Sequence, residues 1–129
     1  MITLSTLKEA TLQEIFEQAA RHLLTQNKKS VDANGMCVYR KLEGDACLKC
    51  AVGIFISDDE YQKSFENKAQ SSITGLNPGC ERSMLLYMLQ KMHDCNDPEF
   101  WRNNLFNIGL RNGLNVSFIE KEFPSEASV

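Results

Sequence analysis

Cysteine and histidine are the residue types in this chain that could carry out covalent chemistry. A thiol beside an imidazole can act as a nucleophile, because the thiolate is the reactive form and the ring can take up the proton. Cys50 lies at the junction between an expected strand and an apolar segment, and His93 is followed by Asp94, whose carboxylate could orient the ring. Cys50, His93 and Asp94 are therefore the candidate catalytic residues of a cysteine-dependent hydrolase or transferase.

The same residues also fit a structural role. Cys50 is embedded among apolar residues, as buried structural cysteines usually are. His93 ends an expected helix, where the helix dipole favours an imidazolium ion without any catalytic function. Because a sequence specifies cysteine–histidine pairs only loosely, we favour a protein that is not an enzyme.

The cysteines also allow a small zinc-binding domain as a second alternative. Cys47 and Cys50 have the CxxC spacing of zinc ligands. The ligand set could be completed from four other residues, namely Cys37, Cys80, His93 and Cys95. No second pair at short spacing accompanies the CxxC, so we favour small buried thiols and expect neither a metal site nor a cofactor.

Basic residues around an expected hairpin predict a binding surface. The predicted binding residues are Tyr39, Arg40, Lys41 and Lys49. Lys28 and Lys29 would join them if the hairpin folds back toward the first helix, and such a patch could bind a phosphate or an acidic protein surface. Since Glu43 and Asp45 lie in the same turn, an ordinary solvated face is the alternative.

The composition limits the class of protein. A chain of 129 residues with 43% hydrophobic and 24% charged residues is typical of one globular domain, here residues 1–129. The formal net charge of -3 disfavours bulk binding to nucleic acid. The N-terminus lacks the pattern of a secretory signal, and no stretch reaches the roughly 18 apolar residues of a membrane span. We therefore expect a cytoplasmic protein that binds neither nucleic acid nor membrane.

The elements that must position these residues begin with a helix and a hairpin. Thr11 and Glu14 form a capping-box pattern that predicts a helix to about Asn27. Residues 36–42 and 47–53 are rich in strand formers and flank a turn at 43–46, which predicts a β-hairpin. Residues 51–56 could equally begin a short buried helix, because a run this short has no decisive period.

Three further helices are expected after the hairpin. A second capping box at Ser57–Glu60 predicts a helix from Asp58 to about Lys68, with Tyr61 and Phe65 as core contacts. The central helix, 81–93, carries a broad apolar stripe that includes three methionines at positions 84, 88 and 92. The stripe is wide enough that part of it could remain exposed for a partner or a homodimer contact.

The last helix has the clearest start in the chain. Asp97–Glu99 places proline at the first helical position, and Gly113 should end the helix. Residues 116–119 could form a short strand, and we expect flexible ends at 1–8 and 124–129. The expected fold class is α+β, predominantly helical, with about four helices packed around one β-hairpin.

Several segments resemble a family of small uncharacterised proteins from phages, prophages and bacteria. The shared pattern consists of the C-x-Y-R segment Cys37–Arg40, the K-C-A-V-G segment Lys49–Gly53, the acidic segment Asp58–Tyr61, the pair His93–Asp94 and Trp101. The chain departs from the family at Ser57, where proline is common, and at Cys47. The resemblance implies a phage or mobile-element origin and supplies no mechanism. Because the chain is also small and acidic and has no complete catalytic signature, we expect a protein-binding module with a host or phage protein as partner, which could modulate a host protein.

Overall fold

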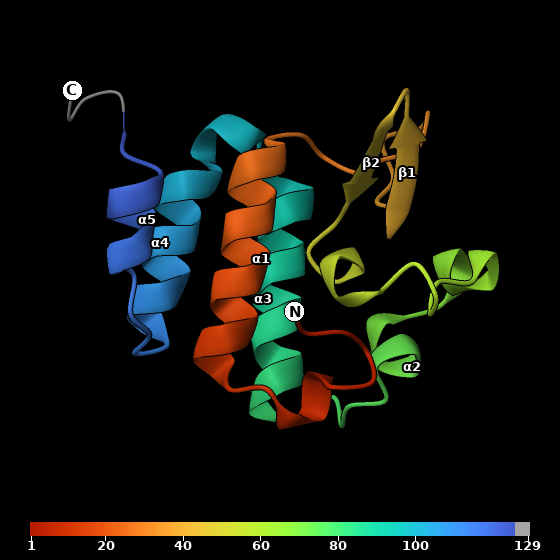
Figure 1. Ribbon diagram of the computed structural model, residues 1–129, viewed down its shortest axis with the longest axis horizontal. Coiled ribbons are helices and arrows are strands. Elements are labelled where there is room, and N and C mark those ends of the chain that lie inside the picture. Colours follow the sequence, from red (N-terminus) through yellow and green to blue (C-terminus); the bar gives the residue numbers. More distant parts are fainter. Residues whose placement is uncertain (126–129) are drawn as a thin grey trace.

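Helices standing side by side form most of the molecule, with a small hairpin at one edge (Figure 1). The computed structural model describes residues 1–125. The longer helices are α1 (Leu12–Gln26), α3 (Glu81–Cys95) and α4 (Trp101–Arg111), which contact one another in pairs. The strands β1 (Arg40–Glu43) and β2 (Ala46–Lys49) form the hairpin, and α2 (Gln70–Thr74) and α5 (Ser117–Glu122) are short helices. The predicted fold class, α+β and predominantly helical, is confirmed.

The first helix begins and ends as its sequence predicts. The Thr11 side chain accepts a hydrogen bond from the Glu14 backbone, and the Glu14 carboxylate accepts one from the Thr11 N–H. Asn27 then adopts a left-handed conformation (φ 51°), which ends the helix. The buried face packs into the core through five residues: Ile15, Phe16, Ala19, Ala20 and Leu23.

The hairpin is confirmed, although it is shorter than predicted. β1 and β2 pair antiparallel with Arg40 opposite Lys49, and Gly44 makes the turn at a positive φ of 61°. Cys37 lies before β1 and forms only an isolated bridge with Val31. After β2 the chain forms a buried 3-10 turn at Gly53–Phe55. Of the two structures considered for residues 51–56, strand and short helix, the helical one is therefore observed.

The helix predicted from Asp58 to Lys68 is wrong. The hydrogen bonds of the cap do form, because Ser57 N–H donates to Glu60 Oε1 and Glu60 N–H donates to Ser57 Oγ. However, the Glu60 carboxylate also accepts hydrogen bonds from the backbone of Leu4 and Ser5, and only a 3-10 turn follows, at Lys63–Asn67. The cap therefore attaches the N-terminal segment, expected to be flexible, to this loop.

The predicted contacts of Tyr61 and Phe65 also differ. Both rings are half-buried, and they pack edge-to-face on each other with centroids 6.3 Å apart instead of entering the core. The strand predicted at 116–119 is wrong as well, because α5 begins at Ser117 and buries Phe118 against Phe16. Helix α4 follows a 3-10 turn at Pro98–Phe100, and Gly113 (φ 67°) comes directly after its C-cap.

One continuous apolar core joins the helices to the segment after the hairpin, with Phe16, Phe55 and Trp101 among its largest side chains. Of the helices in residues 1–125, none combines the length and the apolar character needed to cross a membrane. The part of the expected C-terminal tail at 126–129 lies outside the described residues.

Candidate functional site

The end of α3 meets the segments on both sides of the hairpin at a cluster of chemically active side chains. The ligand atoms of Cys37, His93 and Asp94 all lie within 4.8 Å of one another, and we call these residues the Cys–His–Asp cluster. Cys50 is fully buried, its thiol contacts that of Cys37, and its Sγ accepts a hydrogen bond from Gly53 N–H at 3.4 Å. The thiol in the cluster is thus Cys37, which the sequence indicated as a possible zinc ligand and not as a nucleophile.

Both nitrogens of His93 already have partners. The backbone N–H of Ser30 donates to Nε2 at 3.1 Å, and Nδ1 lies 2.8 Å from Asp94 Oδ1. Because an amide N–H can only donate, Nε2 carries the lone pair and the proton of the neutral ring is on Nδ1. The ring also stacks on Trp101 with centroids 5.4 Å apart. No ring lone pair is therefore free to take a proton from a thiol.

Gln90 completes the hydrogen bonding of this cluster. Its Nε2 donates to Cys37 Sγ at 3.0 Å and to Asp94 Oδ1 at 2.9 Å, while its Oε1 accepts from Val52 N–H at 3.0 Å. The amide thus connects both sides of the hairpin to α3. Such a saturated network rigidifies a core more readily than it supplies a reactive group.

The titration properties agree with a structural role. A hydrogen bond with Cys50, together with burial, raises the pKa of Cys37 far above that of a free thiol, so Cys37 is not a ready thiolate. Burial opposes charge on both partners, but their mutual hydrogen bond raises the pKa of His93 and lowers that of Asp94. The influence of His93 on Cys37 is to lower its pKa, but the hydrogen bond with Cys50 and burial outweigh it, so the thiol stays protonated.

A metal ion would find a thiolate, an imidazole and a carboxylate at the Cys–His–Asp cluster, a donor set that suits zinc. Binding through Nδ1 would move the ring proton to Nε2, where the Ser30 N–H already points. The CxxC pair is not part of such a group, and neither Cys47, Cys80 nor Cys95 joins one among residues 1–125.

A small pocket of about 280 Å³ opens beside the cluster and is lined by Cys37, Gln90 and Asp94, together with Tyr39 and Glu66. Tyr39 donates its hydroxyl to the Lys68 carbonyl at 2.7 Å, and Glu66 accepts the backbone N–H of Tyr39 at 2.8 Å. These bonds fasten residues 63–68 over the start of β1.

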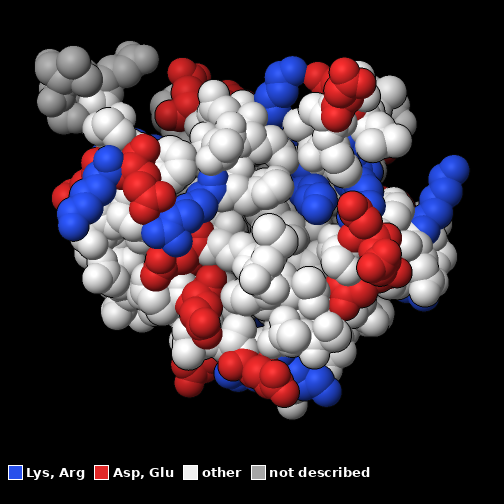
Figure 2. All heavy atoms as spheres, viewed as in Figure 1, with Lys and Arg blue, Asp and Glu red and all other residues white. Residues whose placement is uncertain are grey.

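The predicted binding residues line three different depressions, with Tyr39 in the small pocket beside the cluster. Arg40 is largely buried, with Nη1 3.0 Å from Asp58 Oδ1 and its guanidinium 4.5 Å from the centre of the Tyr61 ring. Arg40 and Lys41 line a depression of about 690 Å³, whereas Lys49 lines a different groove. On the face in Figure 2, acidic and basic side chains are interspersed around the margins and uncharged atoms occupy the centre.

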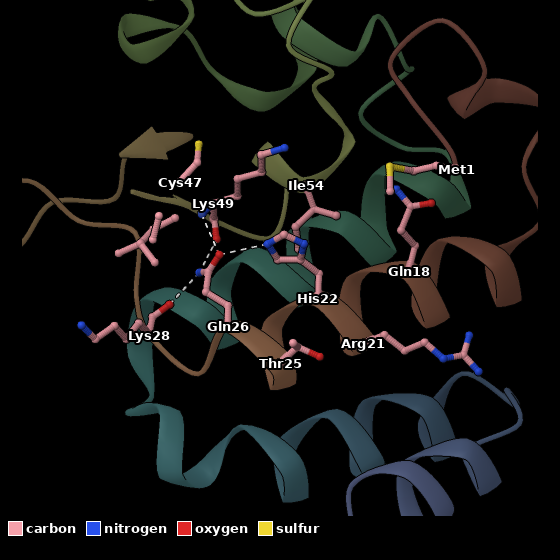
Figure 3. Close-up of a pocket in the computed structure, with 12 residues that line it drawn as sticks. Met1, Gln18, Arg21, His22, Thr25, Gln26, Lys28, Cys47, Lys49 and Ile54 are labelled. Carbon is pink, nitrogen blue, oxygen red and sulfur yellow. Dashed lines mark hydrogen bonds between the residues drawn. The ribbon is translucent and has the colours of Figure 1, made fainter. Parts of the chain in front are cut away.

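Lys49 lies in a groove of about 700 Å³ between α1 and β2, shown in Figure 3. The Gln26 amide crosses this groove, donating to the carbonyl oxygens of Lys28 and Lys49 and accepting from Lys49 N–H. At its rim, Lys28 pairs with Glu43 at 2.8 Å and Arg21 pairs with Glu17 and Glu122. The basic groups of this groove are thus partly neutralised within the molecule.

The predicted methionine stripe of α3 divides into a buried and an exposed part. Leu85, Leu89 and Met92 are buried, whereas Met84 is 53% and Tyr87 59% exposed. Two depressions of about 510 and 310 Å³ adjoin along this exposed side and share Tyr87 and Met88. We call them together the α3–α4 groove, because the second is also lined by residues of α4.

The fold and these surfaces define a small helical α+β domain with a saturated Cys–His–Asp cluster and an exposed apolar helix face. No protein-family model matches the chain, and comparison with curated proteins and with solved structures finds no similar one.

Proposed function

We propose that this chain is a protein-binding module that docks its partner on the exposed side of α3. The observation that carries this proposal is the exposure of Met84 and Tyr87 along a groove on one helix. Exposed apolar residues that gather beside adjoining depressions are typical of interaction sites, whereas scattered ones are ordinary. The Cys–His–Asp cluster supports the same conclusion, because its hydrogen-bonding groups are engaged within the fold.

The resemblance to phage and prophage proteins suggests the setting of this interaction. We propose that the partner is a host or phage protein in the bacterial cytoplasm, and that binding modulates that protein. This origin is supported only by the segments that carry the resemblance, namely Cys37–Arg40, Lys49–Gly53, Asp58–Tyr61, His93–Asp94 and Trp101.

Site-specific photo-crosslinking in host lysate tests the docking surface. A photoreactive phenylalanine analogue replaces Tyr87 in one variant and Phe100, which is 53% exposed and lies outside the groove, in the control variant. The proposal predicts a defined adduct from position 87 and none of the same mass from position 100. Identical adducts from both positions, or none from position 87, would refute it.

A cysteine-dependent hydrolase or transferase is the second candidate function, because Cys37 lines a pocket next to His93 and Asp94. This candidate requires the imidazole to exchange its Ser30 bond for the thiol proton. It predicts that a cysteine of this cluster reacts with iodoacetamide near neutral pH faster than a free thiol. Labelling only after unfolding would exclude it.

A further inference from the structure

We infer that the α3–α4 groove binds an acidic amphipathic helix of the partner protein, an inference that rests on the proposed function. Among residues 1–125, the lining of the groove includes two cationic residues, Lys91 and Arg111, and no aspartate or glutamate. The whole chain, in contrast, has a formal net charge of -3. The groove therefore complements a negatively charged partner.

The two cations are free to meet such a partner. Lys91 and Arg111 are both exposed, and neither forms an ion pair with a carboxylate in residues 1–125. The Lys91 ammonium lies 5.7 Å from the centre of the Tyr87 ring, so it borders the apolar surface. In the groove between α1 and β2, by comparison, Arg21 and Lys28 are already paired with carboxylates.

The apolar lining favours a helix as the bound element. Met84 and Met88 lie four residues apart, as do Tyr87 and Lys91, so the four side chains share one face of α3. Ile108 of α4 borders this face. An exposed helix face that carries methionines beside adjoining depressions is a surface on which an amphipathic helix can lay its apolar face.

A buried amide in the same groove lacks a partner. Asn104 lines the part next to α4, and its Nδ2 is buried with no hydrogen-bond acceptor among residues 1–125. An unsatisfied buried donor costs about 1–3 kcal/mol. Because this nitrogen is closed to solvent, an oxygen of a docked helix would satisfy it only after the Asn104 side chain turns outward.

Two synthetic helical peptides of about 18 residues test the inference. They share leucines at helical spacing and differ only in their polar positions, which are glutamate in one and lysine in the other. Fluorescence anisotropy should show that the glutamate peptide binds more tightly by about tenfold or more, the combined effect expected of two rim charges. Methyl NMR signals of Met84 and Met88 should shift on its addition.

Charge reversal in the groove provides the matched comparison. In the double variant Lys91→Glu, Arg111→Glu the preference should reverse toward the lysine peptide. The control, Lys8→Glu, Lys121→Glu, changes the net charge equally at exposed positions outside the groove and should keep the original preference. Circular dichroism confirms that each variant remains folded.

Several outcomes would overturn the inference. Equal binding of the two peptides, an unchanged preference in the groove variant, or displacement of the glutamate peptide by poly-uridine RNA would each do so. A concentration-dependent dimer that Tyr87→Glu dissolves would assign the groove to a second copy of this chain. If position 87 crosslinks a partner while the peptides bind equally, the protein-binding function stands and only the acidic-helix inference fails.

Discussion

The backbone N–H of Ser30 donates a hydrogen bond to Nε2 of His93 at 3.1 Å, with both residues fully buried. This bond joins the loop between α1 and β1 to the last turn of α3. Asp94 holds the opposite nitrogen, and Trp101 stacks on the ring. The imidazole therefore connects the loop before β1, α3 and α4, and its two nitrogens and its ring face are engaged in these contacts.

Replacing His93 should destabilise the fold. In His93→Leu the ring volume is largely retained, but Ser30 N–H loses its acceptor in a buried site, which costs about 1–3 kcal/mol. Urea unfolding measures the change in the free energy of unfolding. Lys91→Ala, on the exposed side of the same helix, should change it by less than about 0.5 kcal/mol. Equal effects of the two substitutions would show that the Ser30 bond contributes nothing.

The parts of the fold that local residues determine could be predicted from sequence. The Thr11–Glu14 cap specifies where α1 begins, and Gly113 at its positive φ specifies where α4 ends. Both signals are local, because every group involved lies within a few positions of the helix end. The helix predicted from the Ser57–Glu60 capping box does not form, and the Glu60 carboxylate also accepts hydrogen bonds from Leu4 and Ser5, more than fifty residues earlier in the chain. A local pattern cannot contain that distant contact.

The sequence could predict some residues of the candidate site but not how they are arranged in space. His93 and Asp94 were identified, but the choice of Cys50 over Cys37 depended on which thiol the hairpin brings to α3. That choice follows from the isolated Val31–Cys37 bridge and from the Gln90 bond, which connect segments far apart in sequence. The sequence likewise could not predict which part of the α3 stripe is exposed. Periodicity identifies the apolar residues of a helix but not how many of them neighbouring elements cover.

Thiol reactivity should follow the environments of the cysteines. Cys80 precedes α3, and the nearby backbone N–H of Ser83 lowers the pKa of its thiol, whereas Cys37 has a raised pKa and Cys50 is buried. Iodoacetamide at neutral pH should therefore label Cys80 before Cys37 and Cys50, as peptide mass spectrometry can establish. Labelling in urea controls for accessibility. Rapid labelling of Cys37 in the folded protein would instead support the cysteine-dependent enzyme.

The attachment of the N-terminal segment should depend on pH. Burial alone would raise the pKa of Glu60, but hydrogen bonds from Ser57, Ser5 and Leu4 outweigh it and lower the pKa. A lowered carboxylate pKa contributes stability above the ordinary value near 4.5, and this contribution is lost as the pH falls through the folded-state value. The stability advantage over Glu60→Gln should therefore be largest near neutral pH and shrink in acid.

Chemical denaturation between about pH 3 and pH 7 measures that difference. Glu120→Gln removes an exposed carboxylate of α5 and serves as the control, because no hydrogen bond to it is present in the described part of the chain. A Glu60→Gln curve that stays parallel to that of the unmodified protein over the whole range would contradict the assignment.

Gly53 should tolerate no side chain, because the segment after β2 runs directly beneath the start of β1. A Cβ at this position would collide with the carbonyl oxygen of Tyr39, a backbone atom that cannot rotate away. Gly53→Ala should therefore destabilise the protein by at least about 1–3 kcal/mol, the usual range for overpacking, and lower its melting temperature accordingly. Gly79→Ala is the matched control, since its nearest neighbour would be the Asn77 side chain at 3.8 Å. If Gly53→Ala has the same melting temperature as the control, the close approach of these two segments is not required for the fold.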